Sequence, residues 1–141
     1  MIHEPRNAVD WPRSPEGERF WAAAEEHRLL LGHCPACAAT FHPPRVLCPV
    51  CAAPDPSWVQ AAGTGTVFSH TTVFTPFYGE AWAADVPYVV LLVDLDEGVR
   101  LLSRLVGDDA GLRTGARVRV AFRPVGGRTY PFFALDHDGG A

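Results

Sequence analysis

The sequence contains no lysine: all twelve basic residues are arginine, and sixteen acidic residues leave a formal net charge of −4. A protein that neutralises many phosphates normally carries a basic patch, so this balance argues against a nucleic-acid partner. The first residues show neither the basic nor the apolar segment of a secretory signal. The longest strongly apolar stretch, residues 86–93, is too short to span a bilayer. We therefore expect a cytoplasmic protein with no membrane partner.

Sequence patterns that carry catalytic chemistry are also missing. There is no Gly-x-Ser-x-Gly nucleophile turn and no glycine-rich phosphate loop. His70 lies among threonines in a predicted strand, where a histidine is more often structural than a general base. Asp94 and Asp96 run into a predicted hairpin, where solvated carboxylates are common. We therefore predict no catalytic residue, and we do not expect the chain to be an enzyme on its own.

Hydrophobic residues make up 48% of the chain and charged residues 20%, which is typical of a globular protein. Residues 1–28 are predicted to form an N-terminal arm and a helix. The arm covers residues 1–13, which are polar and interrupted by proline. The helix is expected to begin at Ser14-Pro15-Glu16, because serine can cap free amides and proline suits the first helical position. It should run to about His27.

Four cysteines mark a second predicted domain, residues 29–62. Cys34-x2-Cys37 and Cys48-x2-Cys51 are separated by ten residues. This spacing lets two turns direct four sulfurs to one point, which is typical of a tetrahedral zinc site. Four thiolates leave no open coordination position, so one structural zinc is favoured over a catalytic one. Two disulfides and a rubredoxin-like iron site are the alternatives, and reduced cytosolic thiols argue against the disulfides.

From residue 63 onward, short strands alternate with turns, and we predict a barrel domain over residues 63–141. The strands expected in the cysteine domain are 28–33 and 58–62, and those expected in the barrel are 65–74, 88–95, 99–106, 116–125 and 130–135. Residues 96–98 and 126–127 predict tight hairpins, and residues 108–115 predict a short helical turn. This order of elements favours a five-stranded OB-fold, although a small open sandwich gives a similar pattern.

The order of several short motifs over residues 14–135 resembles one protein family. The motifs are a helix, Cys-x2-Cys, Phe41-His42-Pro43-Pro44-Arg45, the second cysteine pair, Trp58, Gly63-Thr64-Gly65-Thr66-Val67, Pro87-Tyr88-Val89-Val90, Leu95-Asp96-Glu97-Gly98 and Leu101-Leu102-Ser103. In this respect the chain is similar to the Zn-ribbon domain-containing OB-fold proteins, formerly a domain of unknown function. The resemblance implies a mainly β fold with an N-terminal helix, a rubredoxin-like zinc ribbon with four cysteine ligands and a C-terminal five-stranded OB-fold barrel.

The resemblance also implies a function. Members of the family are accessory subunits, so the chain is expected to bind and position acyl-CoA thioesters and to dock onto a thiolase-superfamily or lipid-transfer-type aldolase partner. A MaoC-like hydratase is a further expected partner, and degradation of a steroid side chain or of an aromatic acid is the expected setting. The residues predicted to contact acyl-CoA or the partner are Phe41, Pro44, Arg45, Phe74, Phe77, Tyr78, Trp82 and Arg104.

The residues themselves also support two of these predictions. Two prolines fix the backbone before Arg45, and the resemblance makes its guanidinium the best candidate for a CoA phosphate, because the motif is shared with the family. The loop over 75–86 carries three aromatic residues, and loops lie on the surface, so it predicts a partner interface or an acyl-CoA wall. Alternatively, this loop folds back to close one barrel end. The alternative function is a nucleic-acid-binding module in which aromatic side chains stack on bases.

Overall fold

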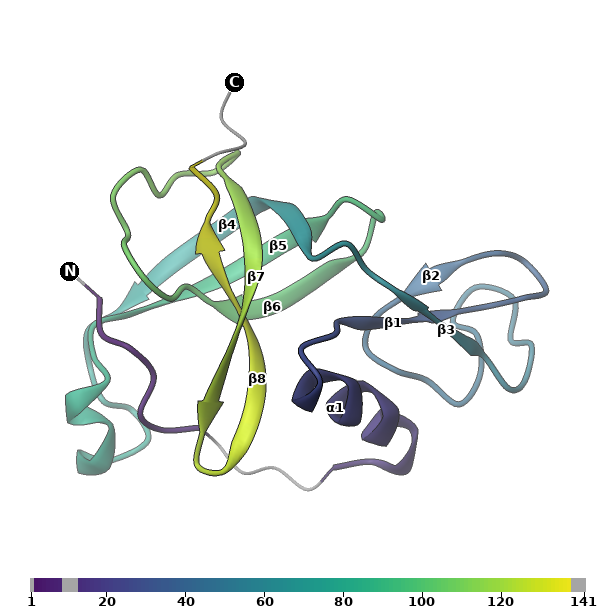
Figure 1. Ribbon diagram of the computed structural model, residues 1–141, viewed down its shortest axis with the longest axis horizontal. Helices are drawn as coiled ribbons and strands as arrows, with labels where there is room; N and C mark the ends of the chain where they lie inside the picture. Colours follow the sequence, from purple (N-terminus) through teal and green to yellow (C-terminus); the bar gives the residue numbers. More distant parts are fainter. Residues whose placement is uncertain (1, 9–12, 138–141) are drawn as a thin grey trace.

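The computed structural model describes residues 2–8 and 13–137 and shows a barrel and a small ribbon sheet with one helix beside them (Figure 1). The five barrel strands are β4 (Thr64–Val73), β5 (Tyr88–Leu95), β6 (Arg100–Arg104), β7 (Arg117–Val125) and β8 (Arg128–Leu135). They pair in the order β6-β5-β4-β7-β8, and each pair is antiparallel. The predicted number of barrel strands is confirmed, as is their sequence along the chain.

Contacts between the two edge strands nearly close this sheet. Leu105, just after β6, forms a parallel bridge with Phe133 of β8, and the Val106 N–H donates to the Phe133 carbonyl at 2.8 Å. The Ser103 hydroxyl donates to the Pro131 carbonyl at 2.7 Å. These contacts cover part of both edges of the sheet, which would otherwise be unpaired. They also decide between the two predicted architectures in favour of the OB-fold barrel.

Strand β5 shows why this part of the sequence forms a sheet. Its burial alternates without interruption, with Val89, Leu91, Val93 and Leu95 inside the barrel, as a period of two requires. Gly98, at φ 84°, allows the tight turn into β6. The hairpin between β7 and β8 uses two consecutive glycines at φ 59° and 80°, the backbone that a two-residue type I′ turn needs.

The ribbon is a three-stranded sheet in the order β2-β1-β3, formed by β1 (Leu30–His33), β2 (Thr40–Phe41) and β3 (Ser57–Gln60). Gly32 of β1 lies directly under the ring of Phe41 in β2. A Cβ atom at Gly32 would lie 2.4 Å from the Phe41 Cε2. Glycine is therefore required here by the close approach of an aromatic ring.

The N-terminal helix is shorter than the sequence predicted. A 3₁₀ turn, η1 (Pro15–Gly17), comes first, and the α-helix α1 spans Glu18–Glu25. Ser14 accepts the Gly17 N–H with its backbone carbonyl at 3.0 Å, and its side chain makes no capping hydrogen bond, so the predicted side-chain cap is wrong. Helical geometry ends before His27, which has a φ of 58°.

Three further differences concern loops. Residues 108–115 form turns without a helix, because Gly111 and Gly115 both have a φ of 89° and interrupt helical geometry. A 3₁₀ helix that the sequence analysis did not predict, η2 (Glu80–Ala84), lies between β4 and β5. Of the predicted arm, residues 2–8 contain no helix or strand, whereas residues 1 and 9–12 lie outside the described residues.

One buried cluster joins all parts of the fold. Phe20 of α1 and Leu31 of β1 pack in the same core as Val67, Leu91 and Phe133 of the barrel. The four residues from β1 and the barrel are at most 1% exposed. The ribbon is thus packed against the barrel through a shared core. Within the described part of the chain, no helix has the length and apolarity needed to cross a membrane.

Candidate functional site

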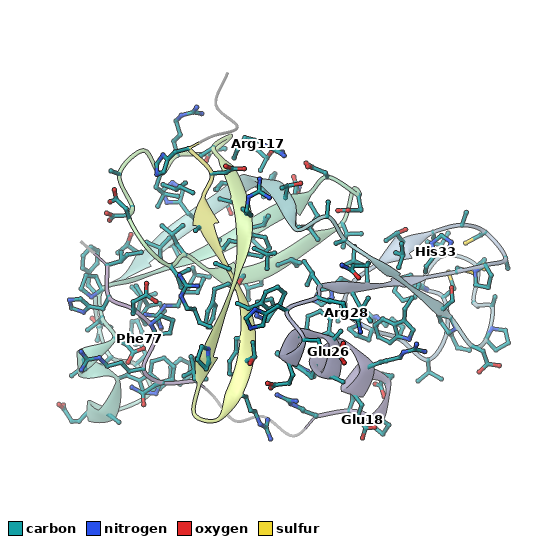
Figure 2. The ribbon with its side chains drawn as sticks, in the orientation of Figure 1. Glu18, Glu26, Arg28, His33, Phe77 and Arg117 are labelled. Atoms are coloured by element: carbon teal, nitrogen blue, oxygen red, sulfur yellow. The ribbon has the colours of Figure 1, made fainter. Side chains whose placement is uncertain are left out.

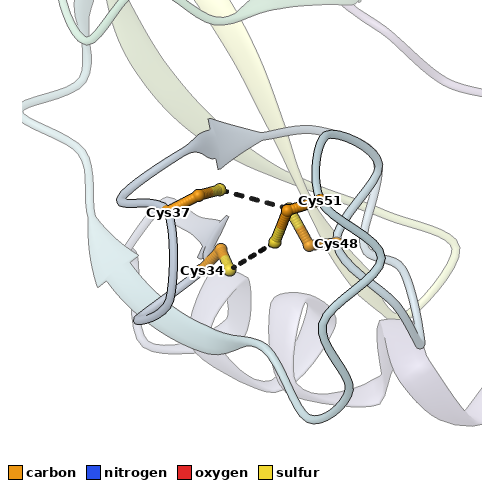
Figure 3. A group of neighbouring side chains, drawn as sticks. All are labelled: Cys34, Cys37, Cys48 and Cys51. Carbon is orange, nitrogen blue, oxygen red and sulfur yellow. Dashed lines mark hydrogen bonds between the residues drawn. The ribbon is translucent and has the colours of Figure 1, made fainter.

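The four cysteines meet at the end of the ribbon, where their side chains turn towards one another (Figure 3). All four sulfurs lie within 4.8 Å of one another. The Cys34 and Cys51 sulfurs are 3.6 Å apart, and those of Cys37 and Cys48 are 3.7 Å apart. These separations are far longer than a disulfide bond of about 2.05 Å. They are close to the edge of about 3.8 Å in a tetrahedron with Zn–S bonds of about 2.3 Å.

Two equivalent backbone turns hold the sulfurs in place. In the first, the Cys34 N–H donates to the Ala39 carbonyl and the Ala38 N–H donates to the Cys34 carbonyl, both at 2.8 Å. The second repeats this pattern around Cys48, at 3.0 and 2.9 Å. Ala38 and Ala52 occupy matching positions with φ values of 64° and 63°. This left-handed conformation normally favours glycine, so each alanine costs stability.

The thiols do not ionise independently. The pKa of Cys48 is lowered to about 7, chiefly by the backbone N–H of Cys51, with a further contribution from the N–H of Val50. The pKa of Cys37 is raised to about 12: the Ala39 N–H lowers it, but desolvation and the neighbouring thiols raise it more. Once one thiol has lost its proton, its negative charge makes ionisation of the neighbouring thiols less favourable. A divalent cation compensates for this repulsion, so the donor set fits zinc.

Neither histidine beside the cluster belongs to the group of converging ligand atoms. The His33 Nδ1 lies 3.3 Å from the Thr40 hydroxyl. The His42 ring packs against Phe20, with centroids 5.2 Å apart, and burial lowers the pKa of His42. The cysteines alone therefore form the site, and four sulfur ligands would fill a tetrahedral coordination sphere.

The residues of the Phe41 to Arg45 motif differ in burial and therefore in what they can contact. Phe41 is buried in the small cluster beside Cys34 and Cys48, so it supports the ribbon from inside. Pro44 is half-buried, and Arg45 is exposed. Arg45 is thus accessible, and its role as a phosphate contact stays a prediction.

The aromatic loop over 75–86 has an exposed part and a part that folds back. Phe77 and Tyr78 are 77% and 63% exposed, and Phe74, at the end of β4, is 73% exposed. Figure 2 places Phe77 beside η2, on the side of the barrel away from the ribbon. Trp82 packs between Tyr78 and Tyr88, at 5.3 and 6.2 Å between ring centroids. The loop therefore presents Phe77 and Tyr78 to solvent and is anchored by Trp82, and exposed Phe74 lies next to its start.

A buried ion pair anchors this loop, and it changes the interpretation of Arg104. Asp85, at the end of the loop, is 0% exposed, and Arg104 is 8% exposed. The Arg104 Nη1 donates to the Asp85 Oδ2 at 2.9 Å, and the Arg104 guanidinium lies 4.7 Å from the Tyr88 ring centroid. Arg104 was predicted to contact acyl-CoA or a partner. Its guanidinium is instead used within the fold, so we do not carry that role forward.

The sequence analysis missed Asp85. This carboxylate also accepts hydrogen bonds from the backbone N–H groups of Arg6 and Asn7, at 3.0 and 3.3 Å, and from the Asn7 amide at 2.7 Å. Burial raises the pKa of Asp85. These hydrogen bonds and the one from Arg104 lower it by more than burial raises it, so the pKa lies below its usual value. Sequence reasoning could not find this role, because the residues next to Asp85 give no indication of partners almost eighty positions away.

The fold and the thiol cluster together define a zinc-ribbon OB-fold protein. Two family models match the chain: the ChsH2 rubredoxin-like zinc ribbon domain over residues 21–57, and the ChsH2 C-terminal OB-fold domain over residues 58–123. A scaffold protein with a DUF35 domain from Methanothermobacter thermautotrophicus is 31% identical over 113 residues, which cover 78% of this chain and 84% of that protein. The chain belongs to this DUF35 family, as its motif order predicted.

Two further relatives extend the comparison. A solved structure described as an Ltp2-ChsH2(DUF35) aldolase contains a chain that is 34% identical, with a TM-score of 0.76, and the match covers 92% of this chain and 98% of that one. A "Probable enoyl-CoA hydratase alpha subunit" from Thermomonospora curvata is 45% identical over 104 residues, or 73% of this chain. This chain spans only 30% of the length of that hydratase subunit.

Proposed function

We propose that this chain is a non-catalytic accessory subunit that docks onto a thiolase-superfamily or lipid-transfer-type aldolase partner. The observation that carries the proposal is the anchored aromatic loop, whose Phe77 and Tyr78 are 77% and 63% exposed. Exposed aromatic side chains on a fixed backbone are typical of interface anchors, because they bury large areas at a small entropic cost. The names of the aldolase and scaffold relatives support the same role.

We further infer that the subunit helps to bind and position acyl-CoA thioesters and that a MaoC-like hydratase is a further partner. The hydratase relative supports the thioester chemistry, and exposed Arg45 is the proposed phosphate contact. Degradation of a steroid side chain or of an aromatic acid remains the proposed setting. We propose a cytoplasmic location because four free thiols suit a reducing compartment.

In this proposal, zinc has a structural role. Cys34, Cys37, Cys48 and Cys51 would hold one ion per chain, and four thiolates leave no position for water or substrate. The chemistry that zinc supplies here is charge compensation and cross-linking of the two turns. Catalytic groups would come from the partner enzyme.

The alternative of a nucleic-acid module is disfavoured by how the strand arginines are paired. Arg117 binds Asp96 through two hydrogen bonds of 2.7 and 2.8 Å, and Arg119 contacts Asp136 at 3.2 Å. Guanidinium groups that are already neutralised by carboxylates attract phosphates weakly. The arginine face of β7 is therefore a poor electrostatic footprint for a nucleic acid.

Affinity purification of the tagged chain from its native cells tests the proposal. We expect a thiolase-superfamily or lipid-transfer-type aldolase to co-purify in a stoichiometric ratio. The double variant Phe77→Ser/Tyr78→Ser should lose the partner, whereas Val50→Ser, which changes a ribbon side chain that is 73% exposed, should retain it. A partner that is stable and fully active without this chain would contradict the accessory role.

A further inference from the structure

One edge of β4 has no neighbouring strand along its second half. In the barrel sheet, β4 lies between β5 and β7. It pairs with β5 along nearly its whole length, but with β7 only over residues 64–66. Val67 extends this contact through hydrogen bonds with Gly115 and Ala116. Among the residues that the structure describes, none forms a backbone hydrogen bond with the other edge of residues 68–73, which faces away from β5. These residues therefore leave an open edge in the sheet.

The register shows which backbone groups point to this open edge. In an antiparallel pair, the N–H and C=O groups of one residue point to the same side, and the side alternates along the strand. The Val89 carbonyl accepts the N–H of Leu105 beside β6 at 3.0 Å, so the polar groups of Val89 point away from β4. Thr72 lies opposite Val89, and its N–H and C=O groups therefore point away from β5. The same holds for His70, two residues earlier, so both residues direct a donor and an acceptor to the open edge.

The side chains at this edge leave the inner face of the sheet incomplete. The side chains of directly opposite residues lie on the same face of a sheet. His70 lies opposite Leu91, which is fully buried, yet His70 is exposed. Thr72 is half-buried, although Val89 opposite it is only 1% exposed. Strand β4 therefore extends beyond the core that it covers, and a further strand beside it would cover these side chains.

The open edge leads directly into the exposed aromatic residues. Phe74 follows the last residue of β4 and is 73% exposed, and Phe77 comes three residues later. Figure 1 shows that β4 ends on the side of the barrel that carries η2. Stable interfaces use about 20–30 residues on each side, far more than this edge offers. A partner at the edge would therefore need the aromatic surface as well.

An extended peptide is the ligand that such an edge fits. Its own N–H and C=O groups alternate along the chain with the same period, so they can pair with those of His70 and Thr72. A second copy of this chain could pair in the same way, related by a twofold axis. Antiparallel pairing of β4 with itself, however, would place the two aromatic loops at opposite ends of the paired strands. A segment of a different protein can cover the edge and the loop together.

We propose that an extended segment of the partner enzyme adds to this edge as a further strand, with hydrogen bonds to the backbone of His70 and Thr72 and side-chain contacts with Phe74 and Phe77. The inference rests on the proposed function and gives the contact with the partner a definite form. The main-chain hydrogen bonds would fix the position of the segment, and the aromatic side chains would supply most of the buried apolar area.

Hydrogen exchange resolved to single residues tests the proposal on the unaltered chain, alone and in complex with the partner enzyme that co-purifies with it. In the free chain, the amides of His70 and Thr72 should exchange fast, whereas the Thr71 amide between them, which points to β5, should be protected. In the complex, the His70 and Thr72 amides should exchange at least about 10-fold more slowly. A partner that contacts only the aromatic loop would leave both amides unchanged.

A proline substitution tests the same contact through binding. His70→Pro removes one outward N–H group, whereas the control His70→Ala removes the side chain and keeps that N–H. Proline is tolerated on sheet edges where the N–H does not pair, so we expect His70→Pro to fold. Its affinity for the partner enzyme should be at least about 10-fold lower than that of His70→Ala, because a hydrogen bond is lost and the ring blocks the added strand. If His70→Pro does not fold, the exchange measurement decides alone.

The remaining outcomes overturn the proposal in distinguishable ways. If the partner enzyme binds and the exchange of the His70 and Thr72 amides does not change, or if His70→Pro binds as tightly as His70→Ala, strand addition is wrong and the accessory role stands. If no thiolase-superfamily or aldolase enzyme binds the chain, the proposed function fails and this inference fails with it. If light scattering shows a dimer of the chain alone that His70→Pro converts to a monomer, a second copy occupies the edge and the proposal is wrong.

Discussion

Replacing Asp85 tests how strongly the N-terminal arm is fixed to the barrel. The carboxylate is fully buried and accepts hydrogen bonds from Arg104 and from two consecutive residues of the arm. The Arg104 Nη2 also donates to the His3 carbonyl at 3.0 Å. Asp85 thus joins the arm, the aromatic loop and β6 at one point. Asp85→Asn removes the charge while nearly preserving the shape.

The expected cost follows from what remains buried. Removing one partner of a buried ion pair leaves the other charge uncompensated, which costs about 3–5 kcal/mol. We expect Asp85→Asn to lower the free energy of unfolding by about 3 kcal/mol, at the low end because the asparagine keeps one acceptor oxygen. The double variant Asp85→Asn/Arg104→Met removes both charges. It should be less destabilised than the sum of the single variants by at least about 2 kcal/mol.

Urea unfolding followed by tryptophan fluorescence measures these differences, and hydrogen exchange locates them. The amides of residues 2–8 and of the loop 75–86 should exchange faster in Asp85→Asn, whereas β4 and β5 should change much less. The pKa of Asp85 in the folded protein lies below its usual value. The contribution of the Asp85 carboxylate to the free energy of unfolding is therefore complete above about pH 4 and is lost at lower pH. A loss below about 1 kcal/mol, or additive single variants, would refute the reasoning.

Three further predictions concern the ribbon and one surface ion pair. Ala38→Gly and Ala52→Gly should each raise the free energy of unfolding of the zinc-loaded protein by about 0.5–1 kcal/mol, because glycine adopts positive φ without steric cost; lower melting temperatures would contradict this. Removing zinc with a chelator should accelerate amide exchange across residues 29–60 and leave β7 and β8 protected. Less than a third of an equivalent of zinc, in protein purified without chelator, would contradict the zinc site itself. The pKa of Asp96 is lowered to about 2, chiefly by its hydrogen bonds with Arg117, so this pair stabilises the fold above about pH 4 and is lost towards pH 2. Because the Asp96 side chain is 44% exposed, Asp96→Asn should cost only about 1 kcal/mol at pH 7 and almost nothing at pH 2 in urea unfolding.

The elements that the sequence predicted well are those specified by local patterns. The strand over 88–95 was predicted with its observed bounds, because its alternation is uninterrupted and a tight turn follows it. The convergence of the four thiols was predicted from the two Cys-x2-Cys turns, each of which is closed by its own backbone hydrogen bonds. In both cases, the interacting residues are close in the sequence.

The features that the sequence did not reveal depend on distant contacts. Asp85 binds residues of the arm that lie 78 and 79 positions away, and nothing near it indicates burial. Arg104 was assigned to a ligand because alternation along β6 does not show that the arm covers its guanidinium. A pocket of about 480 Å³ is lined by Trp21, His42 and Tyr130 together, and no local pattern relates the helix, the ribbon loop and the last strand.

The shared core links the metal centre to the rest of the molecule. Leu29 and Leu31 lead into Cys34 and are buried in the same cluster as barrel residues. His42 and Pro44, between the two cysteine pairs, line a pocket of about 480 Å³. The zinc turns therefore hold one wall of a pocket whose other walls are α1 and the barrel. Zinc binding energy that orders the ribbon also orders this wall, because a loop fixed at both ends has little freedom to leave it. A metal without an open coordination position can thus still determine the shape of a pocket.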